Sequence, residues 1–297
     1  MADWDDLRIF LAVARTESLS GGGRLLKLDP ATVGRRIAKL EEAMAVRLFT
    51  RSAQGYALTG EGLRLVAHAT RAEQAVAEAM QDVGAEGPGL SGQIRVGAPD
   101  GSANYLLPQV VAAICDEHPG LEVQIVALPR VFNLSKREAD MAITVSRPAS
   151  GHLTVQKLTD YKLHLAASRE YLARHPPILS VADLKAHRTI GYIQDMIFDK
   201  ELDYQTDVGM EAVTLASNSV SVQFNWVRTG AGVAVVHDFA LPAAPGLVRI
   251  LADQVSLTRT FYLIRHPDDR RVERLNRFAG LLAQGVRREV ARLEALA

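Results

Sequence analysis

The sequence predicts an α+β protein of several domains: a small winged helical domain, a long helix and a larger α/β region. Three observations predict it. Short helical patterns fill the first 45 residues, one unbroken helical pattern runs from about Thr59 to Val83, and strand and helix patterns alternate after residue 90. At 297 residues the chain is long enough for two domains, each with its own core.

Composition and charge restrict the class of protein. The chain has 34 basic and 34 acidic residues, so any surface for nucleic acid has to be local. The acidic first residues do not resemble a secretory signal, and no apolar run approaches the roughly 20 residues of a membrane span. One cysteine, Cys115, excludes an intrachain disulfide framework. We expect a cytoplasmic protein that does not contact membranes.

Three helical patterns open the chain. An apolar stripe at helical spacing begins at Leu7, and the Ser18 hydroxyl can cap a short second helix. Asp29 and Pro30 supply the cap and the first-turn proline of a third helix, which runs to about Ala45. A short helix, a tight turn and a longer helix form a helix-turn-helix, whose second member enters the major groove of DNA.

A hairpin and a local excess of positive charge follow. Two strand-like runs, 48–51 and 56–59, predict a wing that brings Arg51 to the phosphate backbone or the minor groove. Between Arg24 and Arg51, seven basic residues oppose three acidic ones, which is the footprint expected at DNA. The alternative is a helical domain whose charges are merely solvated. We expect these residues at the duplex: Ser20, Pro30, Ala31, Thr32, Arg35, Arg36, Lys39 and Arg51.

A long helix over 60–84 carries an apolar stripe at heptad spacing. The stripe consists of Leu65, Ala69, Ala72, Val76, Ala79 and Val83. A helix of this length spans roughly 35–40 Å, which a domain of 59 residues cannot cover, so we expect a homodimer contact along the stripe. The alternative is that the stripe packs on the chain's own winged domain. The glycine-rich segment 85–90 is typical of a hinge.

The region 91–297 alternates between strand and helix patterns. Strands are expected at 93–98, 121–127, 141–145, 163–167, 232–236 and 260–264, and helices at 103–118, 219–229 and 268–297. This alternation predicts parallel sheets with helices on both faces. The sequence contains no P-loop, no G-x-S-x-G elbow and no HExxH pair, so neither an enzyme nor a cofactor nor a metal is predicted.

Residues 4–84 resemble the DNA-binding domain of LysR-type transcriptional regulators, and the resemblance continues weakly to the C-terminus. The matching residues are Leu7, Phe10, Ala12 to Ala14, Ser18 to Ser20, Ile37, Leu40, Glu41, Arg47 to Phe49, Arg51, Leu58, Thr59 and Gly62. The resemblance implies a winged helix-turn-helix at 1–59 and two α/β lobes of periplasmic-binding-protein type. Lobe I would comprise about 91–161 and 267–297, and lobe II about 162–266.

The resemblance further implies a small-molecule effector in the cleft between the lobes, and assembly as a dimer of dimers. The residues that it places at the cleft are Asp100, Gly101, Ser102, Thr144, Ser146, Ser217, Asn218 and Ser219. Hydroxyls and free N–H groups at helix starts suit anions. Asp100 complicates this, because its carboxylate would repel an anion; it can instead bind an amine or hydroxyl of the ligand, or cap its helix.

The chain departs from the family pattern at two places. Gly21 to Gly23 replace the alanines common in the second helix, which predicts a helix weaker by roughly 2–3 kcal/mol. The polar residues that usually open the recognition helix are mostly missing, so base readout would fall on Thr32, Arg36 and Arg35. We expect a ligand-responsive, sequence-specific DNA-binding transcription regulator. The alternative is an α/β solute-binding or enzymatic domain with an N-terminal helical oligomerisation module.

Overall fold

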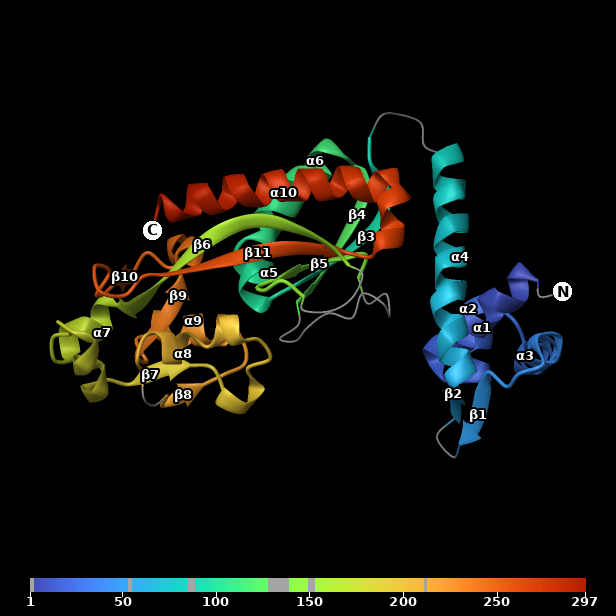
Figure 1. Cartoon of the computed structure of the whole chain (residues 1–297), viewed down its shortest axis with the longest axis horizontal. Helices are drawn as coiled ribbons and strands as arrows, with labels where there is room; N and C mark the ends of the chain where they lie inside the picture. Colours follow the sequence, from blue (N-terminus) through green and yellow to red (C-terminus); the bar gives the residue numbers. More distant parts are fainter. Residues whose placement is uncertain (1–2, 53–54, 85–88, 128–138, 149–152, 211–212) are drawn as a thin grey trace. The chain divides into compact units, whose positions relative to one another are not determined.

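A computed structural model describes the whole chain except residues 1–2, 53–54, 85–88, 128–138, 149–152 and 211–212 (Figure 1). The chain divides into two compact units, residues 1–87 and 88–297. Most of the expected hinge, 85–88, therefore lies outside the described residues. In the described part of the chain, no helix is long and apolar enough to cross a membrane.

The first unit is a winged helix-turn-helix followed by one long helix, as the sequence predicts (Figure 1). Its elements are α1 (Trp4–Thr16), α2 (Leu19–Leu26), α3 (Pro30–Met44), β1 (Phe49–Ser52), β2 (Gly55–Leu58) and α4 (Gly60–Gly84). The expected caps form: Ser18 Oγ accepts from the N–H of Gly21 at 3.2 Å, and Asp29 Oδ1 from that of Thr32 at 2.8 Å. These side chains satisfy N–H groups that a helix start leaves without partners.

The core of this unit joins α1 to α3 and to the wing. It contains Ile9, Phe10, Val13, Val33, Ile37, Leu40, Leu48 and Phe49. Buried Glu41 on α3 accepts from the backbone N–H of Leu48 at 2.7 Å and that of Phe49 at 3.2 Å. One carboxylate therefore fixes where the wing begins after α3.

The three glycines of α2 have a packing role that helix propensity does not reveal. Gly22 and Gly23 are buried. A Cβ at Gly22 would lie 3.0 Å from Val13 Cγ2 on α1, and one at Gly23 would lie 2.6 Å from the carbonyl oxygen of Leu28. The missing side chains allow α2 to approach α1 and the turn before α3. The expected propensity cost is thus only one part of their effect on stability.

The second unit is built on one mixed sheet, ordered β4-β3-β5-β11-β6-β9-β7-β8, with β10 paired to β6. The strands are β3 (Ser91–Ala98), β4 (Gly120–Ala127), β5 (Met141–Thr144), β6 (Thr154–Ser168), β7 (Thr189–Gly191), β8 (Leu215–Ala216), β9 (Val233–His237), β10 (Leu247–Arg249) and β11 (Leu257–Arg265). The α-helices are α5 (Asp100–Tyr105), α6 (Leu107–Glu117), α7 (Arg169–Arg174), α8 (Tyr204–Asp207), α9 (Val220–Arg228) and α10 (Glu273–Glu294). Short 3-10 turns join several of them.

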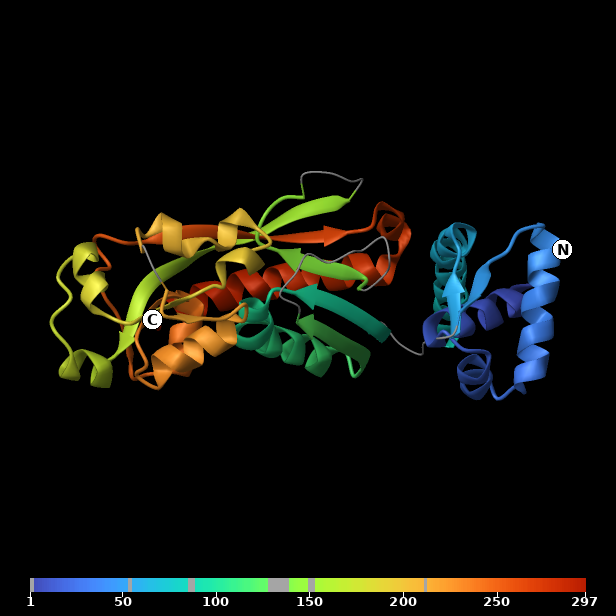
Figure 2. The ribbon, with the colours of Figure 1, turned by 90° about the horizontal axis from the view of Figure 1, so that it is seen from below.

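Two long strands connect two lobes of this unit. We call the part around β3, β4 and β5 the first lobe, and the part around β7, β8 and β9 the second lobe. Strand β6 runs from one to the other, and β11 returns beside it, antiparallel (Figures 1 and 2). Helix α10 packs against β6 and α6. Residues Tyr262–Arg265 of β11 pair with β5, so the chain returns to the first lobe along β11.

The expectation of purely parallel sheets is wrong at the centre. Strands β3, β4 and β5 are parallel within the first lobe, as are β7, β8 and β9 within the second. The crossing strands β6 and β11 run in opposite directions, so each pairs antiparallel with its neighbours. The expected strand 163–167 is only the last third of β6.

Two expected helices also differ in extent. The predicted helix 103–118 is two helices that meet at Leu106, because Pro108 lacks an N–H and its ring would clash with the preceding turn of a continuous helix. The predicted helix 268–297 begins at Glu273, after a 3-10 turn over Pro267–Arg271. The short elements from α7 to β8 were not expected, because none carries a full period of apolar residues.

The glycine contacts predict opposite effects for two Gly→Ala substitutions in one domain. Gly23→Ala should lower the free energy of unfolding by about 1–3 kcal/mol, because the added Cβ meets backbone that cannot move freely. Gly34→Ala, in the middle of α3, should raise it by up to about 1 kcal/mol, because its Cβ meets only the end of Leu19 at 3.4 Å. Urea denaturation followed by circular dichroism measures both. A stabilising Gly23→Ala would show that helix propensity outweighs packing.

Candidate functional site

Helix α3 presents an exposed polar face. Ala31, Arg35 and Lys39 are exposed and Thr32 is half-buried. Arg35 Nη2 donates to Thr32 Oγ1 at 3.0 Å. The Thr32 hydroxyl and backbone N–H donate to the Asp29 carboxylate and lower its pKa. The first turn of the helix is therefore ordered by its own side chains, and the Arg35 guanidinium remains at the surface.

Arg36 has a different environment from Arg35. Its Nε donates to Asp6, a carboxylate on α1 that is 1% exposed, and its Nη2 lies 3.4 Å from Asp5 Oδ2. The bond to Asp6 raises the pKa of Arg36, and Lys39 Nζ lies 3.8 Å from the same carboxylate. A buried carboxylate needs such partners, because unpaired charge is costly away from water. Arg36 thus fastens α3 to α1.

The remaining expected DNA contacts have simpler surroundings. Ser20 is exposed on α2, and Pro30 is exposed as the first residue of α3. Arg51 pairs with Tyr56 across the hairpin, and its side chain lies outside the described residues. Ser20, Pro30 and the exposed positions of α3 therefore stay available at the surface.

The stripe on α4 divides into two halves. Ala69 is buried and Leu65 is partly buried against the core of the first unit, and Arg15 on α1 donates to Glu73 at 2.5 Å. Ala72 is half-buried, whereas Val76 and Ala79 are exposed. The side chain of Val83 is outside the described residues. The first half therefore packs on the chain's own domain, which was the alternative interpretation, and the second half faces away from that domain's core.

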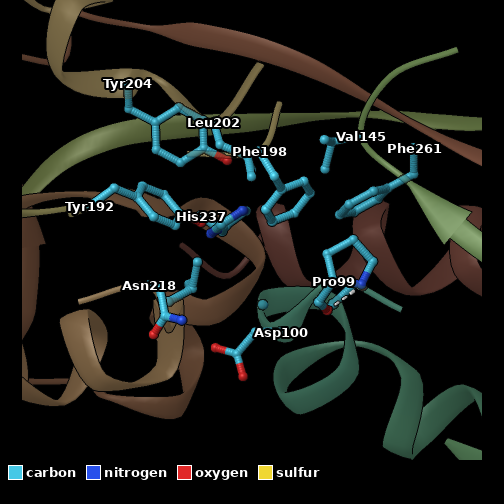
Figure 3. Close-up of a pocket in the computed structure, with 13 residues that line it drawn as sticks. Pro99, Asp100, Val145, Tyr192, Phe198, Leu202, Tyr204, Asn218, His237 and Phe261 are labelled. Carbon is cyan, nitrogen blue, oxygen red and sulfur yellow. Dashed lines mark hydrogen bonds between the residues drawn. The ribbon is translucent and has the colours of Figure 1, made fainter. Parts of the chain in front are cut away.

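A pocket lies in the second unit, where α5, α9 and the end of β9 come together (Figure 3). Counted together with the solvent space at its open mouth, it holds about 370 Å³ of free space. The lining residues are Pro99, Asp100, Gly101, Ser102, Val145, Tyr192, Phe198, Leu202, Tyr204, Asn218, Val220, His237 and Phe261.

Four of the eight expected effector residues line this pocket: Asp100, Gly101, Ser102 and Asn218. The other four lie beside it and bind their own neighbours. Thr144 Oγ1 donates to the carbonyl of Ser146 at 2.8 Å, and Ser146 Oγ donates to Asp199. Ser217 Oγ accepts from the N–H of Ser219 at 3.1 Å, so these hydroxyls shape loops around the pocket.

Asp100 bridges the two lobes. It begins α5 of the first lobe, and its Oδ2 accepts from Ser219 Oγ at 2.9 Å and from the N–H of Ser221 at 2.8 Å. Both donors belong to the start of α9 in the second lobe. Its Oδ1 accepts from Asn104 Nδ2 at 3.1 Å. The carboxylate is thus held at the positive end of a helix dipole.

The rings that line the pocket were not identified from the sequence. Tyr192, Phe198 and Tyr204 come from short turns and α8, where no apolar period marks them. Phe261 lies on the crossing strand β11 and His237 ends β9. Figure 3 shows these rings gathered on the side of the pocket opposite Asp100. Tyr192 and Tyr204 meet within one segment, where Gln205 donates to the carbonyl of Tyr192 at 2.9 Å, and the sheet brings His237 and Phe261 beside them.

Burial keeps the ring groups neutral. Desolvation lowers the pKa of His237 to about 4, and the negative charge of Asp100 opposes that shift only in part. The imidazole stacks on Tyr161 at 5.4 Å between ring centroids. Desolvation also raises the pKa of Tyr192 and Tyr204. Among the residues that line the pocket, the carboxylate is that of Asp100.

Comparison with protein families matches both units. Residues 4–63 match the bacterial regulatory helix-turn-helix protein, lysR family, and residues 87–287 match the LysR substrate binding domain. The transcriptional regulator PtxR of Pseudomonas aeruginosa is 28% identical over 253 residues, which cover 82% of this chain and 80% of PtxR. The transcriptional regulator CrgA of Neisseria meningitidis is 25% identical over 286 residues, covering 94% and 96%.

Solved structures share the architecture. The structure of CrgA from Neisseria meningitidis aligns with a TM-score of 0.59 at 24% identity and covers 95% of this chain and 98% of that one. Full-length OxyR C199D from Pseudomonas aeruginosa aligns with a TM-score of 0.69 at 19% identity, covering 97% and 98%. At these identities the likeness shows the fold alone.

The buried imidazole predicts a pH-dependent stability. His237 titrates near 6.5 when unfolded and at about 4 when folded, so between these values the unfolded chain binds more protons and stability falls as pH falls. From pH 6.5 to pH 5 this group should cost roughly 2 kcal/mol. Urea denaturation at pH 7 and pH 5 should therefore show a shallower pH dependence for His237→Gln than for the wild type. Parallel losses in the two proteins would contradict the assignment.

Proposed function

This chain belongs to the LysR-type transcriptional regulators, and from that premise we propose that it reads operator DNA with the exposed face of α3 while a ligand in the pocket of residues 88–297 controls this binding. The family consists of transcription regulators rather than enzymes, so the alternative of an enzymatic α/β domain is set aside. The observation that carries the residue-level proposal is the exposed guanidinium of Arg35, which donates to Thr32 at 3.0 Å in the ordered first turn of α3.

The proposal assigns different roles to the basic residues of α3. Arg35 and Thr32 approach the base edges, and Lys39 adds charge toward the phosphates. Arg36 becomes a positioning residue, because its bond to Asp6 sets the angle between α3 and α1. Ala31, Pro30 and Ser20 form the surface that surrounds these contacts with DNA. Arg51 reaches the phosphate backbone or the minor groove from the hairpin. In this proposal, Arg35, Thr32 and Lys39 contact the DNA, and Arg36 holds the helix that carries them.

We further propose that the chain forms homodimers through the outer half of α4, and that dimers pair into tetramers. Val76 and Ala79 support this, because they are apolar or small, exposed, and in register with the buried Ala69. Two such chains would place two recognition helices on the half-sites of a palindrome-like operator. Leu65 and Ala69 support this contact indirectly, by fixing α4 to the winged domain.

Arg35→Ala tests the DNA-binding surface. Affinity for the DNA upstream of the chain's own gene should fall by roughly 10–100-fold, equivalent to about 1–3 kcal/mol, because a direct contact of the guanidinium is lost. Fluorescence anisotropy between about 50 and 200 mM salt measures it, and wild-type affinity should fall as salt rises. Arg174→Ala, an exposed arginine on α7 of the other unit, is the matched control. Binding that is unaltered by Arg35→Ala, or absent in the wild type at low salt, contradicts the proposal.

Val76→Asp tests the dimer contact. Val76 is 38% exposed on the stripe, and a charge there should halve the mass measured by light scattering, because an apolar seam does not accept an unpaired carboxylate. Leu63→Asp is the matched control: Leu63 is 58% exposed on the same helix but lies off the stripe, and the variant should keep the wild-type mass. An unchanged mass for Val76→Asp would place the contact elsewhere.

A further inference from the structure

We propose that the effector of this protein is a small organic cation, a primary amine or quaternary ammonium compound, held between the Asp100 carboxylate and the aromatic rings of the pocket. The inference rests on the proposed function, in which this pocket is the effector site. It adds the chemical class of the ligand, which follows from the charges and rings of the lining.

The first argument is that the best anion site at the pocket is already filled by the protein. Helix α9 has nine residues, and its free N-terminal N–H groups would ordinarily attract an anion. Here Asp100 Oδ2 accepts from the N–H of Ser221 and from Ser219 Oγ, while Ser219 Oγ also accepts from the N–H of Val222 at 3.3 Å. An anionic ligand would have to displace Asp100 and then tolerate its charge nearby.

The second argument is the charge of the lining. The thirteen lining residues include no lysine or arginine, and His237 is neutral. The field of Asp100 reaches His237 and Tyr192, because it raises the pKa of both groups. Burial is the main cause that raises the pKa of Tyr204; Asp199 and Glu201 also raise it, whereas Arg259, whose guanidinium carbon lies 5.9 Å from the ring centroid, lowers it. Arg259 is itself paired with Glu201 at 3.0 Å and with Asp207. The pocket therefore favours a positive ligand over a neutral or negative one of equal size.

The third argument is the rings. Tyr192, Phe198, Tyr204 and Phe261 surround the free space on the side facing away from Asp100 (Figure 3). Aromatic faces attract ammonium groups through the ring quadrupole, and more strongly where water is excluded. Phe198 is 36% exposed, whereas Tyr192 and Tyr204 are buried, so Phe198 is the ring that a ligand can cover at little cost to the core. Carboxylate and rings together make a receptor for a cation.

The competing explanation is that Asp100 serves only to join the lobes. Its contacts to α9 fit that role equally well, so the test has to separate the charge of the carboxylate from its hydrogen bonds. Asp100→Asn separates the two for the contact between the lobes, because the amide oxygen can still accept from Ser219 and Ser221 while the negative charge is removed; the bond from Asn104 within α5 is lost.

The experiment compares matched ligands on the full-length protein. Benzylamine, benzyl alcohol and benzoate differ mainly in charge, as do choline and its neutral analogue 3,3-dimethylbutanol. Isothermal titration calorimetry should give at least one ammonium compound an affinity about tenfold or more above its neutral partner, with benzoate weakest. Asp100→Asn should abolish this preference. Phe198→Leu, which removes the exposed ring, should lower the affinity for the ammonium compound several-fold and the affinity for its neutral partner less.

Three outcomes would overturn the inference. Tighter binding of benzoate than of benzylamine is one, and no ammonium compound exceeding its neutral partner is another. A loss of thermal stability in Asp100→Asn with an unchanged ligand preference is the third, and it would leave Asp100 as a link between lobes only. DNA binding of the same wild-type sample separates the two proposals: DNA binding without ammonium preference removes this inference alone, whereas no DNA binding removes the proposed function.

Discussion

The antiparallel pairing of β6 with β11 is the constraint on which the larger unit depends. Each strand crosses between the lobes once, in opposite directions, so the two lobes share one continuous sheet. The ends of β3 and β9, with the helices that follow or precede them, consequently face each other. Asp100 can meet Ser219, 119 residues away, only because this pairing is in place. The same pairing puts Phe261, a residue of β11, into the wall of the pocket.

The smaller unit depends on close approach and on one buried charge. Glycines let α2 pack against its neighbours, and the pair formed by Asp6 and Arg36 joins α3 to α1 across 30 residues of sequence. These contacts hold a helix whose outer face is basic in a chain whose net charge is zero. The position of this basic face is fixed by packing rather than by its own charge.

The sequence could predict those features that depend on residues close together in the chain. Caps and turns are local, so Ser18, Asp29 and Pro30 marked the helix starts of the winged domain within a residue or two. Partners are not local, so the sequence did not reveal that Asp6 on α1 binds Arg36. The glycines of α2 were read by propensity, because the atoms they touch are known only once the chain is folded. In the second unit, the apolar patterns of the sequence predicted β3, β4 and β9. They did not predict the full length of β6 or the aromatic rings that lie on short turns. Half of the expected cleft residues line the pocket, because the strand ends that carry them come together. The other half bind neighbouring residues instead.

The placement of Asp100 also determines how the charge of a ligand would affect the arrangement of the lobes. A ligand shifts a conformational equilibrium only through a difference in its affinity for the two states. A cation sharing Asp100 with Ser219 and Ser221 keeps the contact between α5 and α9, and it meets the carboxylate and the rings together only while the lobes are joined. It therefore favours the arrangement seen in this structure. An anion competing for the start of α9 has to break that contact and favours separation. Whether a ligand favours joined or separated lobes thus depends on which partner Asp100 keeps. The carboxylate cannot remain bound to the start of α9 while an anionic ligand occupies that place.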